Sequence, residues 1–233
     1  MERVRGIGFD LDHTLAIDNR LERVAFLHLL DIVLAEGGRP LGGFADEIDD
    51  IDELLQQQRQ GEFSVDDAVR RFVVARGLEP SERYAEWFRR AAVEMVEEFV
   101  VPLPGVRRML DRLRERAISV AILSNGWNPL QLRKAQQTAF DGPVLVSSEI
   151  GEQKPTSGAF EKLLQTLGTE AAATWYVGDD PRSDVAGAQA AGMRAVWFNW
   201  ERKAYPPESP PPDYTIEDLS ELLELLPAAV RAT

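Results

Sequence analysis

The stretch Arg5–Thr14, which reads RGIGFDLDHT, runs from a short apolar segment directly into two acidic residues. Its first part predicts a strand over Arg5–Asp10, because short apolar runs of this kind are typical of strands buried on both faces. Asp10 and Asp12 then lie at the carboxyl end of that strand. Ligands of open parallel sheets bind outside the carboxyl ends of the strands, so this stretch indicates both the fold and the place of a site.

Further strand patterns follow much later in the chain. These patterns are Ile118–Leu123, Pro143–Val146, Thr174–Val177 and Arg194–Phe198. Helical patterns alternate with them, and this alternation predicts an α/β fold with a doubly wound parallel sheet covered by helices. We expect the spatial strand order 3-2-1-4-5, because the acidic residues that follow strands one and four must meet at the switch point between them.

The long interval between the first two strands has helical spacing throughout. Its segments are Arg20–Glu36, Phe44–Gln58, Ser64–Arg76 and Ser81–Val100. Ser64 followed by Asp67 is a variant of the capping box that opens a helix. We therefore predict two domains: a core formed by residues 1–17 and 101–233, and an inserted all-helical cap formed by residues 18–100.

Composition narrows the function classes. The apolar fraction of 44% and the charged fraction of 28% are typical of a globular protein, and there are no cysteines and two histidines, which excludes disulfides, thiolate sites and multi-histidine metal sites. The net charge of −13 repels nucleic acid and anionic membranes, so neither is expected as a partner. The first residues show no signal-peptide pattern, and we expect a cytoplasmic protein, either a monomer or a homodimer.

Polar and charged residues follow the predicted strands at the same edge of the sheet. They are Asp10 and Asp12 after strand one, Ser124 and Asn125 after strand two, Lys154 after strand three, and Asp179, Asp180 and Asp184 after strand four. Crowded carboxylates destabilise a fold unless cations neutralise them. Lys154 supplies one positive charge, and Mg²⁺ is a divalent ion that suits carboxylate ligands and a substrate phosphate. Such an ion makes an acidic protein locally attractive to phosphate.

These motifs, in this order, resemble those of the haloacid dehalogenase superfamily. The matching segments are DLDHT at 10–14, Ser124, Lys154 and GDDPRSD at 178–184. Within the superfamily the resemblance is to phosphatases whose helical cap is inserted after the first motif. It implies a Rossmann-like core and Mg²⁺-dependent hydrolysis of a small phosphorylated metabolite, a phosphate monoester, through an aspartyl-phosphate.

The resemblance also implies a role for each acidic residue. Asp10 is the nucleophile, and Asp12 is the general acid and then the general base. Mg²⁺ is held by the carboxylates of Asp10 and Asp179 and by the carbonyl of Asp12. Asp184 holds metal-bound water or orients Lys154, and Asp180 is the other candidate for that role. The spacing does not choose between Asp180 and Asp184.

The remaining motif residues are implied to handle the phosphate. Thr14 orders the loop of the first motif, while Ser124 and the backbone of Asn125 bind the phosphate. Lys154 neutralises charge on the phosphate and on Asp10.

Other functions remain open at this point. One is a 2-haloacid dehalogenase, which uses the same aspartate nucleophile without metal, although Asp12 and the acidic fourth motif argue against it. Another is a phosphomutase-type transferase. A further alternative, from a different class of function, is that the chain is a non-catalytic binding or regulatory module. Arginines of the insertion are candidates for binding a second anionic group; they are Arg20, Arg23, Arg59, Arg70 and Arg71.

Overall fold

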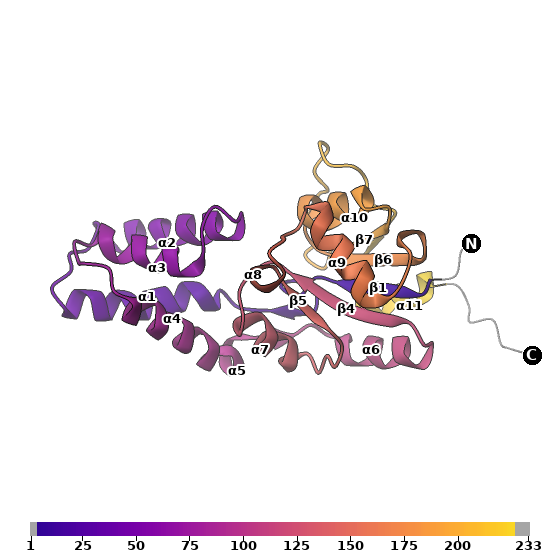
Figure 1. Ribbon diagram of the computed structural model, residues 1–233, viewed down its shortest axis with the longest axis horizontal. Helices are drawn as coiled ribbons and strands as arrows, with labels where there is room; N and C mark the ends of the chain where they lie inside the picture. Colours follow the sequence, from indigo (N-terminus) through magenta and orange to yellow (C-terminus); the bar gives the residue numbers. More distant parts are fainter. Residues whose placement is uncertain (1–3, 227–233) are drawn as a thin grey trace, which may run out of the picture. The chain divides into compact units, whose positions relative to one another are not determined.

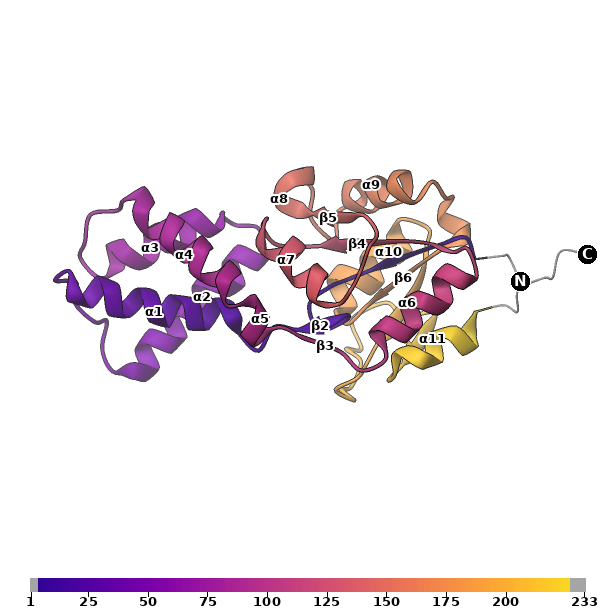
Figure 2. The ribbon, with the colours of Figure 1, turned by 90° about the horizontal axis from the view of Figure 1, so that it is seen from below.

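The computed structural model describes residues 4–226, and its chain divides into two compact units. One unit, the core, contains Met1–Ile17 and Val101–Thr233, and the other, the insertion, contains Asp18–Val100. Figures 1 and 2 show the strands within the core and the helices that form the insertion.

The core is built on a six-stranded sheet with the order β5-β4-β1-β6-β7-β8. Its strands are β1 (Gly6–Phe9), β4 (Ser119–Ser124), β5 (Val144–Val146), β6 (Thr174–Gly178), β7 (Arg194–Phe198) and β8 (Tyr214–Ile216). All neighbouring strands pair in parallel. The order of the first five is the predicted 3-2-1-4-5, so the doubly wound parallel sheet is confirmed.

The sixth strand, β8, was not predicted. Ile216 pairs with Phe198 of β7, and helix α11 (Leu219–Leu225) begins after Asp218. The side chain of Asp218 accepts a hydrogen bond from the backbone N–H of Ser220 at 2.7 Å and so caps this helix. A three-residue strand after a proline-rich segment carries too little periodicity to be distinguished from a loop.

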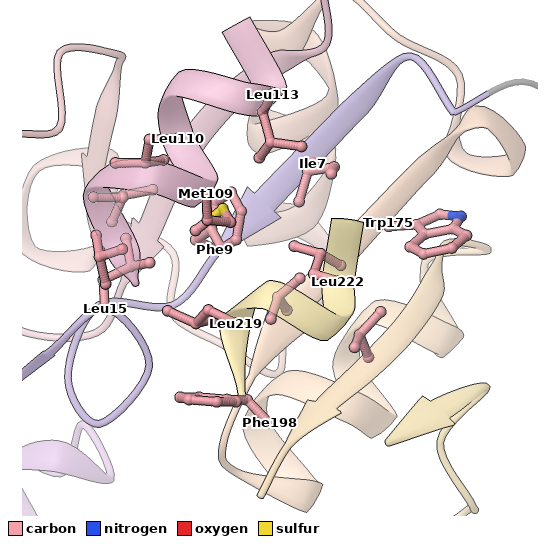
Figure 3. Close-up of a cluster of buried hydrophobic side chains, with 14 of the residues drawn as sticks. Ile7, Phe9, Leu15, Met109, Leu110, Leu113, Trp175, Phe198, Leu219 and Leu222 are labelled. Carbon is pink, nitrogen blue, oxygen red and sulfur yellow. The ribbon is translucent and has the colours of Figure 1, made fainter. Parts of the chain in front are cut away.

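Side chains alternate across β1 and define the two faces of the sheet. Ile7 and Phe9 are fully buried on one face, in a cluster with Met109 and Leu113 of α6 (Val106–Glu115) and Leu222 of α11. Figure 3 shows these side chains packed between the two helices and β1. A strand buried in this way orders the residues that follow it.

The opposite face of β1 is lined by glycine and covered by α9 (Ser157–Leu167). A Cβ at Gly8 would lie 2.5 Å from Cδ2 of Leu163 and 2.7 Å from Cδ2 of Tyr176. Gly8 therefore permits the close packing of α9 and β6 on the strand that carries Asp10. Phe160 on α9 packs edge-on against Tyr176, with 5.1 Å between the ring centroids.

Smaller elements complete the core. They are β2 (Ala16–Ile17), β3 (Val101–Pro102), α7 (Leu130–Gln137), α8 (Ser147–Ile150), a 3₁₀ turn η1 (Ala171–Ala173), a π-helical segment η2 (Pro181–Ala186) and α10 (Gly187–Ala190). Strands β2 and β3 pair antiparallel, with Ala16 opposite Pro102 and Ile17 opposite Val101. This short sheet holds together the two points at which the chain leaves and re-enters the core.

The insertion contains five helices within its described residues. They are α1 (Leu21–Ala35), α2 (Phe44–Arg59), α3 (Val65–Ala75), α4 (Glu82–Glu94) and α5 (Val96–Phe99). The rings of Phe26, Phe72 and Phe88 form its core, with centroids of Phe26 and Phe88 4.4 Å apart. Ser64 and Asp67 form the predicted capping box of α3. None of the helices within residues 4–226 combines the length and the apolarity that a membrane crossing requires.

Several of the candidate arginines of the insertion are engaged within it. Arg23 pairs with Asp52, Arg70 with Asp67, and Arg59 lies 3.9 Å from Glu22, while the guanidinium of Arg71 lies over the ring of Phe63. Each of these four arginines thus has a partner within the insertion.

Candidate active site

Asp10 lies at the carboxyl end of β1 and forms a buried ion pair with Lys154. The Lys154 ammonium lies 2.5 Å from Oδ1 of Asp10 and 2.7 Å from Oδ1 of Asp184. All of these side chains are almost completely buried. Burial favours the neutral amine, but the charges of Asp10 and Asp184 raise the pKa of Lys154 well above its usual value. Lys154 therefore carries a permanent positive charge between two carboxylates.

Three carboxylates converge beside this lysine. Oxygen atoms of Asp10, Asp179 and Asp184 lie within 4.8 Å of one another. Burial, together with the charges of Asp184 and Asp12, raises the pKa of Asp10 to about 7 despite the attraction of Lys154. Burial and the charges of Asp10 and Asp184 raise the pKa of Asp179 to about 9. One lysine is thus insufficient to keep the cluster ionised near neutral pH.

This cluster fits a hard divalent cation. Carboxylate oxygens are the ligands that Mg²⁺ prefers, and a few of them with water and substrate oxygens complete its coordination. The pKa values of Asp10 and Asp179 are raised because the carboxylates are buried close together, and a cation bound among them would offset this crowding. Gly178 allows the Asp184 carboxylate to lie close to the end of β6, because a Cβ at this position would lie 2.2 Å from Oδ2 of Asp184.

Asp180 and Asp184, which spacing did not distinguish, have different surroundings. Asp180 is exposed, and its Oδ1 accepts hydrogen bonds from the backbone N–H groups of Arg182 at 2.9 Å and Ser183 at 2.5 Å, which caps η2. Asp184 is buried beside Lys154, and its Oδ2 accepts a bond from the backbone N–H of Asp180 at 3.0 Å. The geometry therefore places Asp184 in the carboxylate cluster and Asp180 at the start of a helical segment.

Asn125 fixes the segment that carries Lys154. Its Nδ2 donates to the Lys154 carbonyl and its Oδ1 accepts from the Lys154 backbone N–H, each at 2.9 Å. This pair of hydrogen bonds joins the end of β4 to the loop before α9. The side chain of Asn125 thus positions Lys154, in addition to the backbone role implied for this residue.

Asp12 lies in a second group of polar residues that the sequence did not reveal. Its Oδ1 accepts from the Lys134 ammonium at 2.9 Å, and its Oδ2 accepts from Nε2 of Gln131 at 2.7 Å. The same nitrogen lies 2.6 Å from Oγ of Ser124. Gln131 and Lys134 lie on α7 and are spaced as i and i+3. The sequence does place these two polar residues on the otherwise apolar face of this helix, and that pattern could have indicated a buried polar contact.

Thr14 is fully buried, and its backbone N–H donates to the Leu11 carbonyl in the tight loop after Asp12. Its Oγ1 has no hydrogen-bond partner among the described residues. His13, between Asp12 and Thr14, has a left-handed backbone with φ 64°. The chain thus turns sharply directly after Asp12.

Comparisons with known proteins bear on this geometry. A glyceraldehyde 3-phosphate phosphatase of Pyrococcus furiosus is 27% identical over 239 residues, which span 97% of this chain and 94% of that protein. The structure matches the magnesium-bound HAD-hydrolase YfnB of Bacillus subtilis with a TM-score of 0.72 at 24% identity, covering 97% of this chain and 99% of that one.

A 2-haloacid dehalogenase from Pseudomonas syringae pv. Tomato DC3000 is also similar, with a TM-score of 0.70 at 25% identity over 95% of this chain and 97% of that one. The family model of haloacid dehalogenase-like hydrolases matches residues 4–192, which include every residue of the carboxylate cluster. The chain belongs to the family of haloacid dehalogenase-like hydrolases.

Proposed function

We propose that this hydrolase is a Mg²⁺-dependent phosphatase that acts on a small phosphate monoester through an aspartyl-phosphate. The observation that carries the proposal is the convergence of Asp10, Asp179 and Asp184 within 4.8 Å, beside the buried Lys154. A site of this kind has too much negative charge to bind phosphate without a cation and suits phosphate once a cation is present. The phosphatase from Pyrococcus furiosus, similar over nearly the whole chain, supports the same substrate class.

In this mechanism an oxygen of Asp10 attacks phosphorus, and the bond from phosphorus to the ester oxygen breaks. Asp12 gives a proton to the departing oxygen, so the alcohol leaves neutral. Asp12 then removes a proton from water, which attacks the phosphoryl group on Asp10 and releases inorganic phosphate. Lys154, 2.5 Å from Asp10, neutralises charge throughout.

The carboxylates of Asp10 and Asp179, with the carbonyl of Asp12, are proposed to hold the Mg²⁺, and Asp184 supports them. When bound, the ion supplies positive charge to the nucleophile and to the phosphate oxygens. Positive charge there also favours the ionised form of Asp10, whose pKa is raised by burial and by neighbouring carboxylates. Ser124 is proposed to donate its hydroxyl hydrogen to a phosphate oxygen.

A dehalogenase is the second candidate, because a 2-haloacid dehalogenase is among the similar structures. Dehalogenation would use Asp10 as nucleophile but would require neither a cation nor an acid for the departing halide. The carboxylate cluster and the polar surroundings of Asp12 therefore favour phosphate-ester hydrolysis.

The proposed function is tested by release of phosphate from 4-nitrophenyl phosphate with Mg²⁺ and with a chelator. We expect turnover that depends on Mg²⁺, and a loss of at least about 10⁴-fold in kcat for Asp10→Asn, because the amide is similar in shape but is not a nucleophile. Asp141→Asn, at an exposed Asp that belongs to none of the motifs and pairs with Arg114, is the matched control and should retain full activity.

Release of chloride from 2-chloropropionate is measured in parallel. Halide release without phosphate release, or phosphatase activity that survives in Asp10→Asn, would contradict the proposal.

A further inference from the structure

Helix α7 buries a polar pair on its inner side. Leu130, Gln131, Lys134 and Ala135 form its buried side, and Gln131 and Lys134 are 2% and 1% exposed. A lysine and a glutamine are rarely buried unless their polar groups are bonded. Their polar ends meet Asp12, which follows β1, and Ser124, which is the last residue of β4. Gln131 and Lys134 can therefore be buried because their polar ends bond to Asp12 and Ser124.

Asp12 is held at both of its carboxylate oxygens. Lys134 donates to Oδ1 at 2.9 Å, and Gln131 donates to Oδ2 at 2.7 Å. The carboxylate itself remains 28% exposed, so it is accessible from one side while its orientation is fixed from the other. Two donors on one helix, one turn apart, fix the plane of a carboxylate in a way that one donor does not.

The contact with Asp12 also determines the polarity of the hydrogen bond to Ser124. A carboxylate accepts hydrogen bonds, so the NH₂ group of Gln131 must face Asp12. The same NH₂ lies 2.6 Å from Oγ of Ser124, and Ser124 must therefore accept there. Its own hydrogen makes one long bond, to the Asn125 carbonyl at 3.4 Å, and a phosphate oxygen at the usual O–H···O distance would replace this weak acceptor.

We propose that Gln131 and Lys134 are positioning residues: Lys134 holds Asp12 in the orientation for proton transfer, and Gln131 both holds Asp12 and turns the Ser124 hydroxyl into a donor for the phosphate. This inference rests on the proposed phosphatase function. It predicts different effects when the two side chains are substituted, because Gln131 contacts Ser124 as well as Asp12.

The test compares phenyl phosphate with 4-nitrophenyl phosphate, which have similar shapes but different leaving groups. Phenolate is a poor leaving group and needs a proton donor, whereas 4-nitrophenolate needs it far less. Lys134→Met should lower kcat for phenyl phosphate by about 100-fold and for 4-nitrophenyl phosphate by less than about 10-fold, with little change in KM. Lys134→Arg, which keeps the charge and the donors, should recover most of the loss.

Gln131→Met should show the same dependence on the leaving group and an additional effect on phosphate. Its inhibition constant for inorganic phosphate should rise by about 10-fold, because Ser124 loses its fixed polarity, whereas Lys134→Met should leave that constant unchanged. Gln136→Met, at an exposed position of the same helix, is the matched control. Equal losses for both esters, or an unchanged phosphate constant in Gln131→Met, would overturn the proposal.

Crystal structures of Lys134→Met and Gln131→Met provide a readout that is independent of turnover. We expect the Asp12 carboxylate to leave its present orientation in both, and an unmoved carboxylate would overturn the proposal. If the natural protein hydrolyses neither ester, the proposed function fails, and these structures still decide the positioning role. If Lys134→Met does not fold, Lys134→Gln replaces it, with the same dependence on the leaving group expected.

Discussion

At the scale of single residues, Asp10 and Asp179 couple the stability of the protein to pH. Their pKa values are raised to about 7 and about 9, mainly by burial and by neighbouring carboxylates. An acid whose pKa is higher in the folded state than in the unfolded state binds its proton more tightly when folded. The free energy of unfolding therefore falls as pH rises from the unfolded pKa, about 4, to the folded one.

We predict that the melting temperature of the metal-free protein falls between about pH 5 and about pH 9. Because Mg²⁺ binds the ionised carboxylates, it should raise the melting temperature more at high pH than at low pH, by on the order of 5 °C at the upper end. Calorimetry with Mg²⁺ and with a chelator measures both effects.

Asp179→Asn should reduce the pH dependence of the metal-free protein. The control is Asp141→Asn, because Arg114 lowers the pKa of Asp141, so that its contribution lies below this pH range. A metal-free melting temperature that is constant over the range would contradict the raised pKa values.

At the level of secondary structure, the segment that runs from β6 into η2 gives different surroundings to two aspartates that are four positions apart. Asp180 caps η2 and Asp184 contacts Lys154. We predict that Asp180→Ala lowers stability by about 1 kcal/mol, a fall of roughly 2–4 °C in melting temperature, while Mg²⁺ affinity is nearly unchanged.

Asp184→Asn should instead weaken Mg²⁺ binding by about 10–100-fold, because it removes a carboxylate from the cluster. Isothermal titration with Mg²⁺ and thermal melts of the two variants make the comparison. A loss of Mg²⁺ affinity in Asp180→Ala equal to that in Asp184→Asn would show that the cap is also part of the cation site.

At the scale of the whole molecule, the insertion begins and ends beside a paired two-stranded sheet. Ile17 lies opposite Val101, so residues 18–100 can be replaced by a two-residue Asn-Gly turn between β2 and β3. We predict that this shortened chain folds, since the core has its own buried clusters on both faces of the sheet.

The shortened chain should retain aspartyl chemistry but rank a panel of phosphate esters differently from the full chain, because we expect the insertion to select the leaving group. The measurement is kcat/KM for each ester, with unfolding followed by circular dichroism. An unchanged ranking would assign substrate selection to the core alone.

From the sequence alone, the order of the first five strands could be predicted correctly. The same patterns predict a helical insertion and a polar edge of the sheet. These follow from local patterns: apolar runs of strand length, helical periodicity, and acidic residues directly after a strand. Strand β8 was not predicted, because its three residues follow a proline-rich segment and show no such pattern.

Which polar side chains meet follows from the packing of the elements and could not be predicted from the sequence. Asp180 and Asp184 have equivalent positions in the motif, and burial and the direction of the chain through η2 separate them. Gln131 and Lys134 are far from Asp12 in sequence, and their contacts exist because α7 packs its inner side toward the loop after β1. A hydrogen bond between distant residues depends on how elements pack, and the pattern along one segment contains no information on that packing.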